Sequence, residues 1–181
     1  MNSNSNNDIY STSRGEIISS NNFSAYGGPE GADVNDSGAV VFQYRPFGQP
    51  NNQIVLLLPN GSIGFITPPT VNAIDPAIND SGEIVWSEQI WNDPGVSYYY
   101  AIFSSTLGQL ADGTYMADEP DISNNGTIVF RGVSGPDGAG IYEIAAPATP
   151  LPATLSLFAT GLGAFGLLGW RRKRKARAIP A

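Results

Sequence analysis

The chain has 181 residues with a net charge of −7, and it contains no cysteine and no histidine. Disulfides, thiolate and imidazole metal sites, cysteine nucleophiles and the Ser-His-Asp triad are therefore excluded. The first 150 residues carry sixteen acidic residues against three arginines, a net charge of −13. A body this acidic repels phosphate backbones, so we expect no nucleic-acid binding.

The N-terminal residues 1–7 have neither the basic start nor the apolar run of an export signal. Residues 8–19 are predicted to be a partial copy of the repeat described next, the last hairpin of an earlier unit. Both observations favour a missing upstream portion, and the alternative is an open array that does not close.

Three segments align without gaps at an interval of 44 residues: Val34–Phe42, Ile78–Trp86 and Ile122–Phe130. In each, an apolar residue is followed by three small polar residues and a glycine, which predicts a hairpin turn with the glycine at positive φ. The turn residues are Asn35, Gly38, Asn79, Gly82, Asn124 and Gly126, and the core residues after them are Phe42, Trp86 and Phe130. Apolar side chains alternate on both faces of the following strand, which indicates a central strand between neighbouring repeats.

The remainder of each period supplies a second hairpin, most clearly at Gln53–Leu58, the Pro59-Asn60-Gly61 turn and Ser62–Thr67. Four strands in 44 residues make a unit the size of a propeller blade. We predict an all-β repeat body over residues 1–145, with about three propeller-like blades near 32–75, 76–119 and 120–145, the last lacking its fourth strand. A β-solenoid of stacked hairpins is the alternative.

The first turn also has a weak likeness to a calcium loop, because Asp33, Asn35 and Ser37 alternate before Gly38 as in the opening of an EF-hand loop. The twelfth position, which needs a bidentate carboxylate, is Tyr44. Hairpin turns explain the pattern unaided, so we expect neither a metal nor a cofactor.

Aromatic residues gather at Trp86, Trp91 and Tyr98–Tyr100, where they could stack on sugar rings, although strand aromatics more often belong to the core. Paired-carboxylate hydrolysis would further require Asp75, Glu88, Asp93 and Asp118 to converge in one cleft. The only lysines lie in the tail, which removes a Ser-Lys dyad as well, and we predict that the chain is not an enzyme.

The C-terminal part begins with a linker at residues 146–150 and continues with uncharged apolar sequence over 151–170. Twenty residues rise about 30 Å as a helix, which matches the hydrocarbon core of a bilayer, so we predict a transmembrane helix rather than a buried core helix. The basic residues that follow, Arg171, Arg172, Lys173, Arg174, Lys175 and Arg177, predict a cytoplasmic tail and a body on the outer side.

Pro150, Leu151, Pro152 and Ala153, the glycine-rich span and the basic cluster resemble the PEP-CTERM class of sorting signals, in the variant that reads Val-Pro-Leu-Pro-Ala. Thr149 stands where that variant has valine. The resemblance covers about thirty of the 181 residues, the sorting signal at 151–181 with its proline motif, apolar span and basic tail at 171–177. It implies export, recognition by the membrane enzyme exosortase and removal of the helix, in bacteria that produce exopolysaccharide.

The repeat is similar to the tandem Asn-x-x-Gly-x-x-x-Phe units of bacterial surface proteins, with Ser123 as the departure in the third copy. We therefore expect a cell-surface or extracellular protein, anchored in the bilayer before processing, with a structural or adhesive role and exopolysaccharide as a potential partner. The alternatives are a lectin-like or carbohydrate-active propeller and a cytoplasmic protein anchored by its tail.

Overall fold

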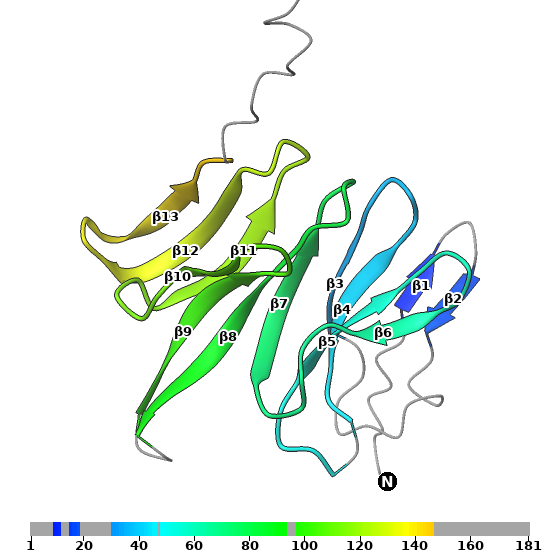
Figure 1. The fold of residues 1–181 in the computed structure, drawn as a ribbon, viewed down its shortest axis with the longest axis horizontal. Coiled ribbons are helices and arrows are strands. Elements are labelled where there is room, and N and C mark those ends of the chain that lie inside the picture. Colours follow the sequence, from blue (N-terminus) through cyan, green and yellow to red (C-terminus); the bar gives the residue numbers. More distant parts are fainter. Residues whose placement is uncertain (1–8, 12–14, 19–29, 47, 94–96, 147–181) are drawn as a thin grey trace, which may run out of the picture. The chain divides into compact units, whose positions relative to one another are not determined.

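The computed structural model describes residues 9–11, 15–18, 30–46, 48–93 and 97–146. These residues form thirteen strands in four antiparallel sheets and no helix, which confirms the all-β prediction (Figure 1). The described residues therefore include no candidate for a helical membrane span. The predicted span at 151–170, the sorting motif and the basic tail lie outside the described residues.

Two sheets have four strands each, arranged in chain order as antiparallel meanders. The first contains β3 (Glu30–Val34), β4 (Val40–Tyr44), β5 (Gln53–Leu57) and β6 (Ile63–Phe65). The second contains β7 (Asn72–Ile78), β8 (Ile84–Asp93), β9 (Ser97–Ser104) and β10 (Gly108–Ala111).

The third sheet has three strands, β11 (Ala117–Ile122), β12 (Ile128–Gly135) and β13 (Gly138–Ile144), and a small hairpin joins β1 (Ile9–Ser11) to β2 (Gly15–Ile18). The three larger sheets begin at Glu30, Asn72 and Ala117, a few residues before the predicted copy boundaries near 32, 76 and 120. The reason is that the whole strand before each turn pairs with the strand after it. Residue 75, where we placed the end of the first copy, consequently lies inside β7.

The sheets that begin with β3, β7 and β11 open with the same hairpin, as the sequence predicted. Asn35 N–H donates to the oxygen of Ala39 (3.1 Å) and Gly38 N–H to the oxygen of Asn35 (2.9 Å), and the turns that begin at residues 79 and 123 repeat both bonds. The turn glycines 38, 82 and 126 have φ of 80°, 84° and 85°, a region that costs a glycine nothing.

Neighbouring sheets pack face to face through the side chains that the sequence assigned to the core. Val41 of β4 packs with Ile78, Ile84 and Trp86 of the second sheet. Val85 of β8 packs in the same way with Ile122 and Ile128 of the third sheet. Strand β4 and the first part of β8, residues 84–87, are thus buried on both faces.

Strand β12 departs from this pattern. Val129 occupies the position of Val41 and Val85, which are fully buried, yet it is 36% exposed. The prediction that the strand after the turn is sandwiched by neighbours is wrong for this copy, because among the described residues no further sheet follows the third.

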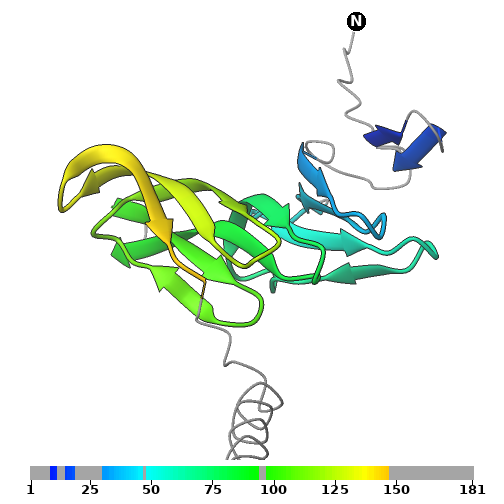
Figure 2. The same cartoon turned by 90° about the horizontal axis from the view of Figure 1, so that it is seen from above.

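The first strands of the three sheets lie next to one another. β7 contacts β3, β4 and β5, and β11 contacts β7, β8 and β9. The hairpin turns of the three sheets consequently stand side by side at one end of the body (Figures 1 and 2).

Each first strand also carries a bulge at the same place in the period, which the sequence did not reveal. The register shifts between Glu30 and Asp33, between Ile74 and Ala77, and between Asp118 and Asp121. Gly31, Asp75 and Glu119 occupy these bulges with φ of 56°, 51° and 51°. Three different residue types share one left-handed position, so the backbone repeat is stricter than the sequence repeat.

Candidate functional site

The hairpin turns are joined from copy to copy by side-chain hydrogen bonds. Asn35 Oδ1 accepts from Ala39 N (3.0 Å) and from the Ser37 hydroxyl (2.7 Å), which fixes its own turn. Its Nδ2 donates to the main-chain oxygen of Asn79, 3.1 Å away in the next copy. One asparagine side chain therefore closes a turn and links two sheets.

Asn79 repeats this geometry. Its Oδ1 accepts from Glu83 N (3.0 Å) and from the Ser81 hydroxyl (2.7 Å), and its Nδ2 donates to the oxygen of Ser123 (3.3 Å). Ser123 takes this position in the third copy, and its hydroxyl lies within hydrogen-bond distance of Asn125 Oδ1 and of the oxygen of Thr127. A serine holds the turn but has no amide group to offer to a following copy.

The second turn position forms a parallel row of bonds. Asp36 N–H donates to Asp80 Oδ1 (2.7 Å), and Asp80 N–H donates to Asn124 Oδ1 (2.9 Å). Asn124 Nδ2 donates back to the Asp80 carboxylate. The side chain at this position thus accepts the N–H of the preceding copy, which is why an aspartate or an asparagine stands there.

The weak calcium candidates Asp33, Asn35 and Ser37 all have their oxygens engaged with protein groups. Asp33 Oδ1 accepts from Val34 N and Oδ2 from Ile78 N, both at 2.8 Å, so this carboxylate too links the first copy to the second. Within the described ranges no three acidic side chains gather closely enough to hold a metal ion. The geometry is that of hairpin turns.

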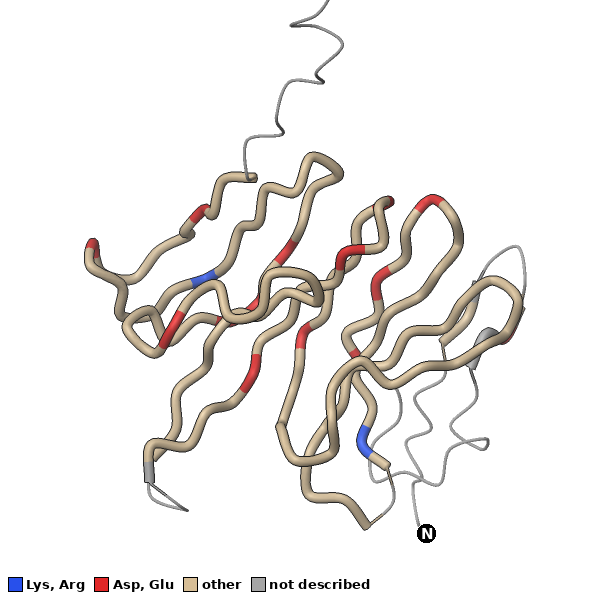
Figure 3. Tube along the Cα trace, viewed as in Figure 1, with Lys and Arg blue, Asp and Glu red and all other residues tan. Residues whose placement is uncertain are grey.

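Acidic side chains are spread over the body, while Arg45 and Arg131 are the basic residues of the described ranges (Figure 3). Of the four carboxylates considered for a hydrolytic pair, Asp75 and Asp118 come close enough to interact, at the bulges of β7 and β11. Burial, and then repulsion by Glu119 and Asp118, raise the pKa of Asp75 above its ordinary value.

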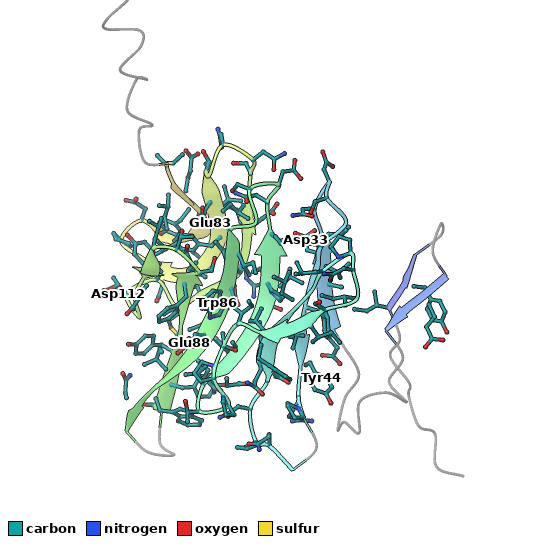
Figure 4. The ribbon with its side chains drawn as sticks, turned by 45° about the vertical axis from the view of Figure 1, so that its right-hand side comes forward. Asp33, Tyr44, Glu83, Trp86, Glu88 and Asp112 are labelled. Atoms are coloured by element: carbon teal, nitrogen blue, oxygen red, sulfur yellow. The ribbon has the colours of Figure 1, made fainter. Side chains whose placement is uncertain are left out.

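Arg131 binds Asp118 through two hydrogen bonds, from Nε to Oδ1 (2.7 Å) and from Nη2 to Oδ2 (2.6 Å). Glu88 lies on β8 two residues from Trp86, whose indole N–H donates to it at 3.4 Å (Figure 4). Burial raises the pKa of Glu88 and this bond lowers it in part. The side chain of Asp93 lies outside the described residues.

The aromatic cluster divides between the core and the surface. Trp86 is buried and stacks on Phe103 with ring centroids 6.1 Å apart. Trp91 and Tyr98 are 49% and 48% exposed and meet edge to face at 5.2 Å, and Tyr100 continues the row at 5.6 Å from Tyr98. Only the surface members could stack on a ligand.

Beside Tyr98 lies an open concavity of about 430 Å³, lined by Asn92, Tyr98, Tyr99, Asp112, Gly113, Thr114 and Met116. Hydrogen bonds from Thr114 hold the pKa of Asp112 below its ordinary value, so this carboxylate is an acceptor at neutral pH. The sequence analysis singled out the aromatic residues but missed Asp112 and Thr114, which follow β10 and are brought to Tyr98 by the fold alone.

The fold and this surface define a class, an acidic all-β protein of stacked antiparallel repeats, without defining a family. No protein-family model matches the chain, and a search of the curated proteins gives no match.

Proposed function

We propose that this chain is an exported, C-terminally sorted protein of the cell surface or extracellular matrix, with a structural or adhesive role and no catalytic one. The observation that carries the proposal is the order of three parts: the motif Pro150 to Ala153, the apolar span 151–170 and the basic run 171–177. An apolar run of this length is a membrane span, and a basic flank stays on the cytoplasmic side. An exosortase-type enzyme, the bilayer before processing and exopolysaccharide are the partners this implies.

The contacts within the β body support a structural role, because polar side chains at the turns form hydrogen bonds between neighbouring copies of the repeat. The side chains of Asn35, Asn79, Asp33 and Asp80 bind neighbouring copies, and Arg131 neutralises Asp118. A row of such bonds stabilises a series of repeats, because repeat proteins generally depend on contacts between neighbouring copies.

The arrangement of sheets supports propeller-like blades over a solenoid. In a solenoid, successive turns extend common sheets by hydrogen bonding, whereas here each copy forms its own sheet and meets the next through side-chain faces. The contact of each first strand with the next is also the relation that innermost strands have in a propeller.

The test is the mass of the mature protein. The full chain, preceded by an export leader, is expressed in an exopolysaccharide-producing host that contains exosortase, and the body is recovered for intact mass measurement. We expect loss of the segment after the motif in the parent chain, and retention of the full tail when Pro150 and Pro152 are both replaced by alanine. Pro147→Ala, in the same linker but outside the motif, is the matched control and should be processed. A parent chain that keeps its tail contradicts the proposal.

A second candidate function, binding of neutral glycans, is favoured by the exposed pair Trp91 and Tyr98 beside the polar concavity of Asn92, Asp112 and Thr114. Exposed aromatic rings with hydrogen-bonding neighbours are suited to the apolar faces and hydroxyls of sugars. Titration of the full chain with a soluble neutral polysaccharide should show binding that Tyr98→Ala weakens at least about tenfold and Leu107→Ala leaves unchanged. Equal binding by both variants excludes this site.

A further inference from the structure

The outer face of the third sheet has the same design as two faces that are covered in this molecule. Val41 in the first sheet and Val85 in the second are fully buried by the sheet that follows, and Val129 is their equivalent in the third. Val133 and Ile141 lie exposed on the same sheet, and Arg131 pairs with Ile141 in the register of β12 and β13. Glu143 pairs with Val129 in the same register, so apolar and charged side chains share this face, and among the described residues nothing covers it.

The polar groups that link the copies also stop at this face. Asp36 and Asp80 donate their N–H groups to the next copy, and Asn124 N–H, the third member of the row, has no partner in the described part of the chain. Asp33 Oδ2 accepts Ile78 N from the next copy, whereas Ala77 has no carboxylate at this position, and within the described ranges the equivalent Asp121 accepts Ile122 N on Oδ1. The face therefore offers one main-chain donor, placed as in both covered interfaces, one carboxylate, placed as in the first, and the strand that carries Val129.

The opposite end of the array carries complementary groups. Val34, which is equivalent to the buried Ile78 and Ile122, is 59% exposed. The Asp36 carboxylate is equivalent to the Asp80 carboxylate that accepts an N–H from the preceding copy, and it has no partner among the described residues. The two ends thus carry the two kinds of group, the N–H donor and the carboxylate acceptor, that are paired between copies inside the chain.

We propose that the outer face of the sheet β11–β12–β13 docks the first repeat of a second copy of this chain, head to tail. The argument is continuity with the two interfaces inside the chain: Asn124 N–H would bond the second copy's Asp36 carboxylate, and Val129 would pack against its Val34. Such an interface is heterologous, so it generates rings or open filaments instead of closed two-fold dimers.

The hairpin β1–β2 opposes this contact. Ile9 packs against Val40, Phe42, Tyr44 and Val55, which form the face of the first sheet that points away from the second. The incoming sheet must displace the hairpin, so its removal should strengthen association.

The test is the assembly state of the full chain in detergent micelles, followed by sedimentation velocity between about 1 and 100 μM, the range in which weak specific contacts form. We expect mass to grow with concentration beyond a dimer, and deletion of residues 1–18 to shift the growth to lower concentration. Val129→Lys and Asp36→Lys each disable one end, so each variant alone should stay monomeric. An equimolar mixture of the two retains one good pair of ends and should form dimers that do not grow.

Leu107→Lys is the matched control, because this exposed side chain lies in the turn between β9 and β10, and it should assemble like the parent chain. Circular dichroism of each variant checks that it is folded, since the replaced side chains are exposed. A parent chain that stays monomeric throughout overturns the proposal. Assembly that survives both Val129→Lys and Asp36→Lys does so as well, because it then arises from the apolar tail or another surface.

Discussion

Asn35 and Asn79 lie 44 residues apart, and Nδ2 of the first donates to the main-chain oxygen of the second at 3.1 Å. The bond connects identical positions of successive copies, and Asn79 makes it again with Ser123. The sequence period is thus also a contact in space. An asparagine is required because one side chain must accept within its own turn and donate to the next.

Replacing Asn79 should therefore lower the free energy of unfolding by more than the loss of an ordinary turn hydrogen bond would. Asn79 is buried, and Asn79→Ala removes three hydrogen bonds and leaves the Ser123 oxygen without this donor. We expect a loss of about 2 kcal/mol in the free energy of unfolding, measured by urea denaturation of the full chain.

Two variants separate the parts of this effect. Asn79→Asp keeps the acceptor that closes the turn but loses the donor, so it reports on the link between copies. Asn60→Ala is the matched control, because Asn60 Oδ1 accepts only from Ser62 N in an exposed turn. If Asn60→Ala and Asn79→Ala lower the free energy of unfolding equally, the hydrogen bond between copies adds no stability beyond that of an ordinary turn bond.

Gly132 should be irreplaceable for a different reason from the turn glycines. A Cβ on Gly132 would lie 2.6 Å from the Tyr142 ring, which stacks on Phe130. We expect Gly132→Ala to cost about 2–3 kcal/mol through overpacking. Gly82→Ala, where a Cβ meets nothing within 4 Å and only the positive φ is strained, should cost about 1 kcal/mol.

A double-mutant cycle tests whether contact with the Tyr142 ring causes the destabilisation expected for Gly132→Ala. In a Tyr142→Ala background the ring is gone, so Gly132→Ala should lose most of its additional cost. If the cost of Gly132→Ala is the same in both backgrounds, the ring contact is not its origin.

Features that depend on local chemistry could be predicted from the sequence, whereas features that depend on strand pairing or on a neighbouring copy could not. The turns and the core residues Phe42, Trp86 and Phe130 were predictable, because local turn chemistry and alternation determine them. The left-handed position of Gly31, Asp75 and Glu119 was not, since its residue types differ and the bulge depends on strand pairing. The exposure of Val129 was likewise not predictable, because an apolar residue in a repeat looks the same whether or not another copy covers it.

Asp75 should make the body less stable as the pH rises through the acid range. Its folded-state pKa is raised by burial and by Glu119 and Asp118, so the protonated form is favoured in the folded state. The stabilising contribution is complete below the unfolded-state pKa of about 3.9 and is lost as the pH passes through the higher folded-state value. Asp75→Asn removes this dependence, and asparagine tolerates the positive φ of this position.

We therefore expect Asp75→Asn to raise the urea midpoint at pH 7 and to change it little at pH 3. Asp137→Asn, in the exposed turn between β12 and β13, is the control and should have no such difference. An Asp75→Asn variant that is destabilised equally at both pH values would contradict the electrostatic argument and point to a lost contact.

The orientation of the body relative to the membrane can be tested without identifying any partner. In intact cells that express the full chain behind an export leader, the six basic residues after Trp170 should hold the C-terminus inside. Protease added from outside should then digest the β body, while a tag placed after Ala181 stays protected until the cells are opened. Replacing the six basic residues by glutamine should reduce this asymmetry, because the flank that is retained on the cytoplasmic side is lost, whereas replacing Arg14, Arg45 and Arg131 by glutamine should not. A body that resists protease in intact cells and becomes sensitive only after lysis would place the array inside and remove the basis for a surface role.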